Sequence, residues 1–592
     1  MKKIYLLLAA SLLSWGLSAQ DLQNVVYDEV NYIVDPETMT AEVGINLQVE
    51  EELIVHELIL VGQDTYKVTS IGDRAFKGCK QLTDIVLPPT IEHIHRSAFE
   101  GTGIWLNKEN WQDGALYLDD ILIAVDKTIK PKFIIPEGTR LIAIGAFRGN
   151  KVLTRVEFPS TITMIDHETF RDCKNLNKVI IPKTITYIGE DAFTGSGIYI
   201  NEKKWKKGAL YIDDALIATN DNTPAKFIVK NKLPVRLIAA GAFAKNKKLK
   251  TITIPADVKI IPSAAFRECP ALTELVLPAG VEEIGNFAFY NCPLLKKINL
   301  SDNMRKIGVG AFYGCANLTE MHLADSITCI PKACFFTCGK LKTVNMPAQL
   351  EQIGDGAFAG CAELENIVLP ENLKEIGEVA FAGCAKLRKM VIPARVNSLK
   401  LETFAECTHL FEVVLPDGFY AIGDRAFKGC VSLEKVNIPK STFRIGKQAF
   451  QNCLNLEKIL LADNIHVIDE EAFRDCKHLL DIALPENLRV LSKGTFASCI
   501  NLQSIRFPKI MHTIEDGACY QCRQIRELQF GDSLRVIGNE AFMECKSLRT
   551  VSFPEVLESI GNAAFKDCES LPRPFVPETA MIGKNAFKGC KQ

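Results

Sequence analysis

The chain has 592 residues, of which 47% are hydrophobic and 24% are charged. This length suits several domains or one long repeat array, and the composition excludes a wholly disordered or collagen-like chain. Sixty-nine basic and 71 acidic residues give a net charge of −2, which does not indicate a nucleic-acid or other polyanion binder. Twenty cysteines in a chain of this length are too sparse for a small disulfide scaffold.

The N-terminus has the pattern of an export signal. Lys2 and Lys3 precede an apolar stretch over residues 4–13, and small residues lead to an expected cleavage point after Ala19. The alternative is a buried N-terminal helix. Neither this stretch nor any later apolar run reaches the ~18 residues that a transmembrane helix needs. We therefore predict a signal peptide over residues 1–19 and an exported mature protein that is secreted or associated with the cell surface.

Residues 20–61 lack the repeat that organises the rest of the chain. Their segments 25–27 and 32–34 are rich in β-branched and aromatic residues, which favours strands. The end of a repeat array exposes apolar side chains that need a cover. We predict a β-rich N-terminal cap over residues 20–61, followed by the repeat array over residues 62–592.

Two segments near residues 101–125 and 195–220 interrupt the array and resemble each other. Each carries a Gly-Ala-Leu-Tyr run that ends in paired aspartates, Asp119–Asp120 and Asp213–Asp214. Paired carboxylates suit a metal or an acid/base site. The alternative is a hairpin whose turn is Asp-Asp, and we favour it because turn chemistry alone accounts for these residues.

A period of 23 residues organises the chain from about residue 70 onward. Fourteen cysteines from Cys269 to Cys568 follow one another at this spacing, and a phenylalanine lies three residues before nearly every one. Seventeen of the 20 cysteines occupy this position. Such a period indicates a solenoid, because a single unit cannot bury its own apolar residues. The phenylalanine position counts about 21 coils between Phe76 and Phe587.

Each coil contains two predicted conformations. Ile85 and Leu87 alternate with polar neighbours as in a short strand, and Pro88 ends that strand. Ala98, Phe99 and the cysteine position have helical spacing, which predicts a short helical or 3₁₀ turn. Stacked coils turn every apolar position into a ladder of similar side chains. We predict a right-handed solenoid with parallel stacked strands.

The repeat Cys-x-x-Leu-x-x-Ile/Val-x-Leu/Ile-Pro-x-x-Leu/Ile-x-x-Ile-Gly-x-x-Ala-Phe resembles the BspA-like leucine-rich repeats of bacterial surface proteins, over roughly residues 70–592. The resemblance implies a leucine-rich-repeat superhelix and a non-enzymatic exported protein for adhesion or host-protein binding. It transfers no site residues, because binding in such families is not tied to a fixed motif. Glycan binding for polysaccharide capture is the alternative function, and an enzyme built on the two inserted segments is the least supported.

The cysteines are expected to be packing residues. Exported proteins often pair their cysteines, but parallel side chains in a ladder point the same way and pairing would distort the stack. We therefore expect thiols that pack as small hydrophobes. Cys519 and Cys522 form a C-x-x-C redox pattern whose spacing the repeat already dictates. Cys329, Cys334 and Cys338 have no nearby histidine to complete a zinc site, so no metal or cofactor is predicted.

Recognition must use the variable positions, because the ladder positions are committed to the core. The position just after the second apolar Leu/Ile carries aromatic and then basic side chains in six successive coils: Tyr420, Phe443, His466, Arg489, His512 and Arg535. Aromatic residues and arginine are enriched at binding hot spots, and rings also stack against sugars. We predict that this aromatic–basic column binds a protein or glycan on a host or neighbouring cell surface. Chance variation in a variable position is the simpler alternative.

Overall fold

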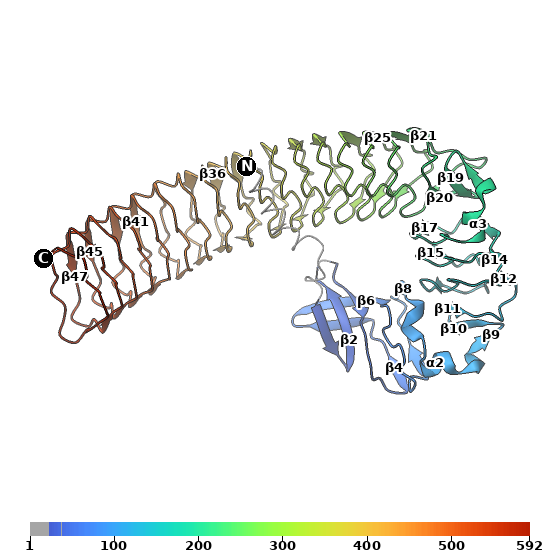
Figure 1. Ribbon diagram of the computed structural model, residues 1–592, viewed down its shortest axis with the longest axis horizontal. Helices are drawn as coiled ribbons and strands as arrows, with labels where there is room; N and C mark the ends of the chain where they lie inside the picture. The colour runs from blue at the N-terminus through green and yellow to red at the C-terminus, as the bar shows by residue number, and fades with distance from the viewer. Residues whose placement is uncertain (1–22, 37, 592) are drawn as a thin grey trace. The chain divides into compact units, whose positions relative to one another are not determined.

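The computed structural model describes residues 23–36 and 38–591 (Figure 1). The predicted signal peptide, residues 1–19, lies outside the described residues. The chain divides into unit 1, which is Met1–Leu249 with Thr253–Phe266, and unit 2, which is Lys250–Ile252 with Arg267–Gln592. Within the described ranges, none of the helices has the length and apolar character needed to cross a bilayer.

Unit 1 begins with a mostly antiparallel sheet. Its strand order is β1 (Gln23–Tyr27), β2 (Val30–Asp35), β3 (Thr40–Val43), β6 (Asp64–Ile71) and β5 (Leu58–Val61). β3 pairs with β6 in parallel, and β6 pairs in parallel with β8 (His93–Ile94) of the first full coil. Main-chain hydrogen bonds therefore join this sheet to the coils. The extent of the predicted cap, residues 20–61, stays a prediction, since β6 starts beyond it.

The two inserted segments of unit 1 share one local structure. Helices in and around them are short: η1 (Arg96–Phe99), α2 (Gly103–Leu106), η2 (Lys108–Asn110), α3 (Gly197–Ile200) and η3 (Glu202–Lys204). They are followed by the antiparallel strands β9 (Trp111–Gln112), β10 (Ala115–Leu118) and β11 (Ile121–Val125), and by their counterparts β18 (Trp205–Lys206), β19 (Ala209–Ile212) and β20 (Ala215–Thr219). The structure thus repeats the likeness of the two sequences.

The paired aspartates form hairpin turns. Asp119 lies between β10 and β11 with φ 48°, and Asp213 lies between β19 and β20 with φ 47°. The second aspartate of each pair binds an arginine, because Arg140 Nε lies 3.2 Å from Asp120 and Arg236 Nε lies 2.9 Å from Asp214. The hairpin interpretation is confirmed, and these carboxylates hold the hairpin to a neighbouring coil.

Most coils carry two short parallel strands, where the sequence predicted one. In unit 1 the first strands are β4 (Glu52–Ile54), β7 (Asp84–Val86), β12 (Lys132–Ile134), β14 (Arg155–Glu157), β16 (Lys178–Ile180) and β21 (Lys226–Ile228). The second strands are β8, β13 (Leu141–Ile142), β15 (Met164–Ile165), β17 (Tyr187–Ile188), β22 (Leu237–Ile238) and β24 (Ile260–Ile261). β23 (Thr251–Thr253) has residues of both units.

Unit 2 repeats this arrangement with greater regularity. Its first strands are β25 (Glu274–Val276), β27 (Lys297–Asn299), β29 (Glu320–Met321), β31 (Thr343–Val344), β34 (Lys389–Val391), β36 (Glu412–Val414), β38 (Lys435–Val436), β41 (Asp481–Ala483), β43 (Ser504–Arg506), β45 (Glu527–Gln529) and β47 (Thr550–Ser552). Its second strands are β26 (Glu283–Ile284), β28 (Lys306–Ile307), β30 (Cys329–Ile330), β32 (Gln352–Ile353), β33 (Glu375–Ile376), β35 (Ser398–Leu399), β37 (Ala421–Ile422), β39 (Arg444–Ile445), β40 (Val467–Ile468), β42 (Val490–Leu491), β44 (Thr513–Ile514), β46 (Val536–Ile537), β48 (Ser559–Ile560) and β49 (Met581–Ile582). The chain makes about 24 turns of β-solenoid. The count of about 21 from the phenylalanine position is lower because it omits the two inserted segments.

A stack of phenylalanine rings fills the core of unit 2. From Phe289 to Phe496, rings of successive coils lie face to face with centroids 5.2–5.8 Å apart. Such pairs contribute about 0.5–1.5 kcal/mol each beyond the burial of their area. Cys519 takes the next phenylalanine position and interrupts the stack, which resumes at Phe542. The predicted ladder packing is confirmed.

The cysteine ladder does more than fill space. In at least twelve coils of the described chain the cysteine Sγ donates a hydrogen bond of 2.9–3.3 Å to the carbonyl oxygen of the phenylalanine 26 residues earlier. Cys407, for example, donates to Phe381 at 3.2 Å, and the same carbonyl accepts the main-chain N–H of Cys384 at 3.1 Å. The thiol therefore donates to the second lone pair of a buried carbonyl oxygen. The sequence predicts only that the cysteines pack as small hydrophobes and does not predict this hydrogen bond.

The turn before each cysteine has the hydrogen bonds of the predicted 3₁₀ turn but does not continue as a helix. It contains hydrogen bonds three residues apart, as in a 3₁₀ helix, for example from Cys407 N to the Phe404 carbonyl. Alternate N–H groups instead reach the next coil, as Phe404 N does to Ala426 at 2.8 Å. Glu402 and Glu406 adopt φ 51° and 60°, so the chain leaves the right-handed helical region twice within one turn. Hydrogen bonds to the next coil replace the continuation of a helix.

The positive φ of this turn leads to a prediction on stability. Glu540 has φ 55° and an exposed side chain, and Gly517 occupies the same position one coil earlier with φ 61°. A left-handed conformation costs a non-glycine residue ~1–2 kcal/mol, whereas glycine loses ~0.5–1 kcal/mol of backbone entropy. Glu540→Gly should therefore raise the free energy of unfolding by about 0.5–1 kcal/mol, and Gly517→Glu should lower it by a similar amount. Denaturant midpoints by circular dichroism measure both, and opposite signs would contradict the turn geometry.

Burial of the cysteine ladder leads to a second prediction. Burial raises the pKa of Cys315 to about 12, and it raises the pKa of Cys430 as well, so both stay thiols near neutral pH. Cys329 is exposed on β30. A maleimide reagent at neutral pH should therefore modify Cys329 in the native protein and spare the ladder, and all 20 cysteines should react in denaturant. Peptide mass spectrometry measures the maleimide modification of each cysteine. Modification of Cys430 in the native protein would contradict the prediction, and so would cysteines that stay unmodified in denaturant.

Candidate recognition surface

The aromatic–basic column lies immediately before the second strand of six coils in unit 2. Main-chain hydrogen bonds tie the first three residues to one another, since Phe443 N donates to the Tyr420 carbonyl at 2.8 Å and His466 N donates to Phe443 at 3.0 Å. The same bonds link Arg489, His512 and Arg535 at 2.9 and 3.0 Å. The second strands after His466 and Arg489 belong to separate sheets, so the column consists of two groups of three residues.

The side chains of the column point away from the core. Tyr420 is 54% exposed and Phe443 is 36% exposed, although both are large apolar residues. His466, Arg489 and Arg535 are also exposed, and His512 is half-buried. The register inferred from the repeat thus places these residues on the surface, where a partner can reach them.

Three rings of the column form an exposed stack. The rings of Tyr420 and Phe443 lie 5.6 Å apart with planes 1° from parallel, and those of Phe443 and His466 lie 4.8 Å apart at 19°. His466 Nδ1 lies 2.7 Å from the carbonyl oxygen of Asn464, which can only accept, so Nδ1 carries the hydrogen. Stacking and this hydrogen bond fix the rings in one orientation.

Two of the three residues in the basic half of the column have side-chain partners. Arg535 Nη1 lies 2.6 Å from Glu558 Oε1, and His512 Nδ1 lies 3.0 Å from Thr513 Oγ1. Arg489 makes no side-chain hydrogen bond or ion pair with any residue that the structure describes. The structure therefore places one uncommitted arginine one coil after the stacked rings, and Arg535 and His512 each have a side-chain partner.

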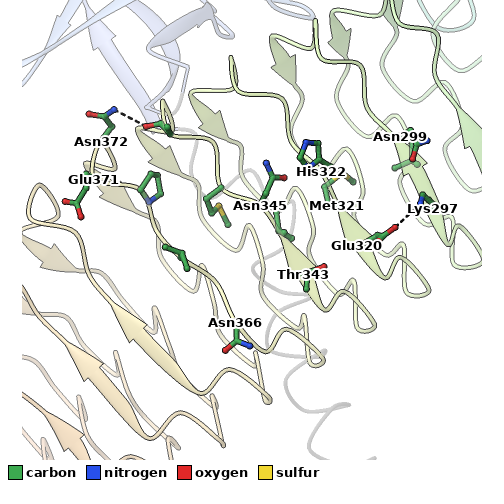
Figure 2. Close-up of a pocket in the computed structure, with 16 residues that line it drawn as sticks. Lys297, Asn299, Glu320, Met321, His322, Thr343, Asn345, Asn366, Glu371 and Asn372 are labelled. Atoms are coloured by element: carbon green, nitrogen blue, oxygen red, sulfur yellow. Dashed lines mark hydrogen bonds and ion pairs between the residues drawn. The ribbon is translucent and has the colours of Figure 1, made fainter.

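Two hollows lie on the first strands of unit 2, away from the column. One has a volume of about 940 Å³ and is lined by residues between Lys297 and Asn372 (Figure 2). The other has a volume of about 620 Å³ and is lined by residues between Lys458 and Asp532. Sequence reasoning missed both. A signal for the first was available in the polar run Asn299, His322 and Asn345, which occupies one strand position in three successive coils.

Unit 1 holds a pair of histidines with acidic and phenolic partners. His93 Nδ1 lies 2.7 Å from Asp166 Oδ2, and this hydrogen bond raises the pKa of His93. The Tyr187 hydroxyl lies 3.2 Å from His167 Nε2, and burial raises the pKa of Tyr187. In the described part of the chain neither imidazole is hydrogen-bonded to a serine, threonine or cysteine side chain. The pair thus lacks the activated nucleophile of a hydrolase.

The cysteine motifs do not form reactive sites. Cys519 and Cys522 of the C-x-x-C pattern are both fully buried, and burial raises the pKa of Cys522 far above its usual value. A buried thiol with a raised pKa is a poor nucleophile for disulfide exchange. Cys334 and Cys338 are buried in the same way. Among residues 23–36 and 38–591, no three His, Cys, Asp or Glu side chains are placed to hold a metal ion.

Solved structures with similar chains include bacterial leucine-rich repeat proteins. A protein from Bacteroides ovatus is 21% identical, covers 93% of this chain and 100% of its own, and gives a TM-score of 0.37. A leucine-rich cell surface protein from Faecalibacterium prausnitzii is 22% identical over 74% of this chain and 94% of its own, with a TM-score of 0.30. The pneumococcal vaccine antigen PcpA is 13% identical over 90% and 98%, with a TM-score of 0.29. No curated protein matches the chain.

The repeats themselves match a family model. Its description is BspA type leucine rich repeat region, and it matches six times, over residues 63–114, 127–218, 236–361, 329–457, 402–524 and 466–592. These matches cover most of the chain, including all of the column and both hollows. The chain therefore belongs to the BspA type leucine-rich repeat family.

Proposed function

We propose that the chain is an exported, non-enzymatic recognition protein that binds a protein partner on a host or neighbouring cell surface. The leucine-rich repeats support a role in protein interaction, and the sequence pattern of residues 1–19 supports export followed by secretion or surface association. The buried state of the thiol motifs and the structural use of the paired aspartates support a non-enzymatic role. Within the solenoid, the aromatic–basic column is the proposed contact surface.

The stacked, exposed rings beside an uncommitted arginine carry this proposal. Tyr420, Phe443 and His466 are already ordered by stacking, so binding costs little side-chain entropy. Arg489 supplies five hydrogen-bond donors with no partner in the described chain to displace. Tyrosine and arginine are among the residues that contribute most to binding at protein interfaces. The column thus combines a rigid apolar contact with an adjacent charged one.

The arrangement of the rings favours a protein partner over a glycan. Sugar rings bind aromatic side chains through the open face of the ring. Both faces of Phe443 are covered, one by Tyr420 and the other by His466. Phe443 therefore offers mainly its ring edge to solvent, and Tyr420 adds a hydroxyl. Edges and hydroxyls suit the side chains and main chain of a protein surface.

A triple substitution tests the column. Tyr420→Ala, Phe443→Ala and Arg489→Ala together should leave the melting temperature nearly unchanged, because surface substitutions typically change stability by ~0.5 kcal/mol or less. Binding should fall by at least ~2 kcal/mol, roughly thirtyfold, if the column contains the hot spot. The measurement is binding of the full chain to immobilised cell-surface extract, before and after treatment of that extract with protease or with periodate.

A matched control uses the same position in earlier coils. Arg305→Ala, Thr328→Ala and Glu351→Ala also remove three exposed side chains before second strands, and this variant should bind like the wild type. Binding that survives periodate and disappears with protease would support a protein partner. Equal binding by the column variant and the wild type would refute the column as the contact surface, and loss of binding with periodate alone would replace the protein partner by a glycan.

A further inference from the structure

Two coils of unit 2 lack a regular first strand, one at residues 366–368 and one at residues 458–460. Residues 366–368 form no strand, and within the described chain no main-chain hydrogen bond joins them to β31 on one side or β34 on the other. Val368 is 82% exposed there. The hollow of about 940 Å³ lies over this interruption and the coils before it (Figure 2). Its lining is referred to below as the amide groove, residues 297–372.

An asparagine next to the interruption binds main chain through its side-chain amide. Asn345 Oδ1 accepts a hydrogen bond from Leu323 N at 2.7 Å, and Asn345 Nδ2 donates to the Leu323 carbonyl at 3.0 Å. Asn437 holds Leu415 in the same way, at 2.8 and 2.9 Å. An asparagine amide at this strand position thus binds both main-chain groups of one residue in the preceding coil.

Other polar side chains in the amide groove have no such partner. Asn299, His322 and Asn366 are exposed and make no side-chain hydrogen bond with any described residue. Figure 2 shows Asn299, His322 and Asn345 on three successive coils. The charges nearby are largely satisfied, because Lys297 Nζ lies 3.0 Å from Glu320 Oε1. The groove therefore offers neutral pairs of donor and acceptor.

The lining also limits the class of ligand. It contains no phenylalanine, tyrosine or tryptophan, so a sugar ring finds no aromatic face to stack on. A charged ligand finds only Lys297 and Glu320, which already pair, and the lone carboxylate of Glu371. An extended peptide main chain, by contrast, presents the same N–H and carbonyl groups that Asn345 binds at Leu323. Val368 adds an apolar contact for a side chain.

We propose that the amide groove binds an extended, uncharged polypeptide segment through its main chain. Asn299 and Asn366 each hold an N–H and a carbonyl of the segment, and an apolar side chain of the segment packs on Val368. This site goes beyond the function proposed above, because none of its residues belongs to the aromatic–basic column. Recognition through main chain makes the groove tolerant of sequence and selective for extended, neutral segments.

The second hollow of unit 2 provides an internal contrast. Leu460 occupies the position of Val368 four coils later and is 74% exposed. Lys458 stands where Asn366 stands in the amide groove, and a lysine donates hydrogen bonds but accepts none. Arg506 and Lys509 add further charge to that lining. The second hollow keeps one amide side chain, Gln529, but its charged lining is not expected to bind the same uncharged segment.

A peptide array tests the proposal with the full chain. The probes are blocked, uncharged decapeptides, each beside a counterpart in which alternate main-chain nitrogens are methylated. The variants are Asn299→Leu with Asn366→Leu, and Asn299→Asp with Asn366→Asp, which keeps the acceptors but removes the donors. Asn501→Leu, which removes an asparagine outside the groove that makes no side-chain hydrogen bond in the described chain, is the matched control.

The wild type should retain a set of the unmethylated peptides and none of their methylated counterparts. Both double variants should bind at least about tenfold more weakly at an unchanged melting temperature, because each loses several hydrogen bonds. Asn501→Leu and the column triple variant should bind like the wild type.

Equal binding of methylated peptides, no retained peptide, or wild-type binding by the double variants would overturn the proposal. So would binding of a neutral glycan array that depends on Asn299 and Asn366. The column triple variant separates this outcome from the function proposed above.

Discussion

Hydrogen bonds between the main chains of successive coils are the constraint on which the rest of this structure depends. Phe404 N reaches Ala426 at 2.8 Å, and Phe443 N reaches Tyr420 at 2.8 Å, each across one repeat. Every side chain therefore lies beside the residue one repeat away. Buried positions become stacks of one residue type, and exposed positions become columns whose composition the sequence can vary without disturbing the core.

The two candidate binding surfaces use this constraint in opposite ways. The ring stack of the aromatic–basic column relies on the paired second strands β37, β39 and β40, which hold Tyr420 and Phe443 with their rings parallel. The amide groove lies where the first-strand ladder fails at residues 366–368. One coil earlier, the side chain of Asn345 binds the main chain of Leu323. A local departure from a regular pattern is a common place for function, because regular coils use all of their main-chain groups internally.

The features that follow from side-chain periodicity were predictable from the sequence. The 23-residue period, the phenylalanine stack, the Asp119–Asp120 turn and the exposure of Tyr420 all belong to this class. The second strand was missed because two residues, such as those of β37, are too few to show alternation. The glycine that precedes many of the turns is explained only in three dimensions: a Cβ on Gly377 would lie 2.5 Å from Asp355 N. The groove was missed because it depends on main-chain hydrogen bonds that are absent, and side-chain patterns do not report them.

Amide hydrogen exchange at residue resolution on the full chain tests the central claim most directly. If hydrogen bonds between coils hold the solenoid, slow exchange should recur every 23 residues, and the amides of Phe404 and Phe427 should be among the slowest. The amides of residues 366–368 should exchange much faster than those of β34 and β36. Protection without a 23-residue period, or residues 366–368 as protected as β34, would contradict the account.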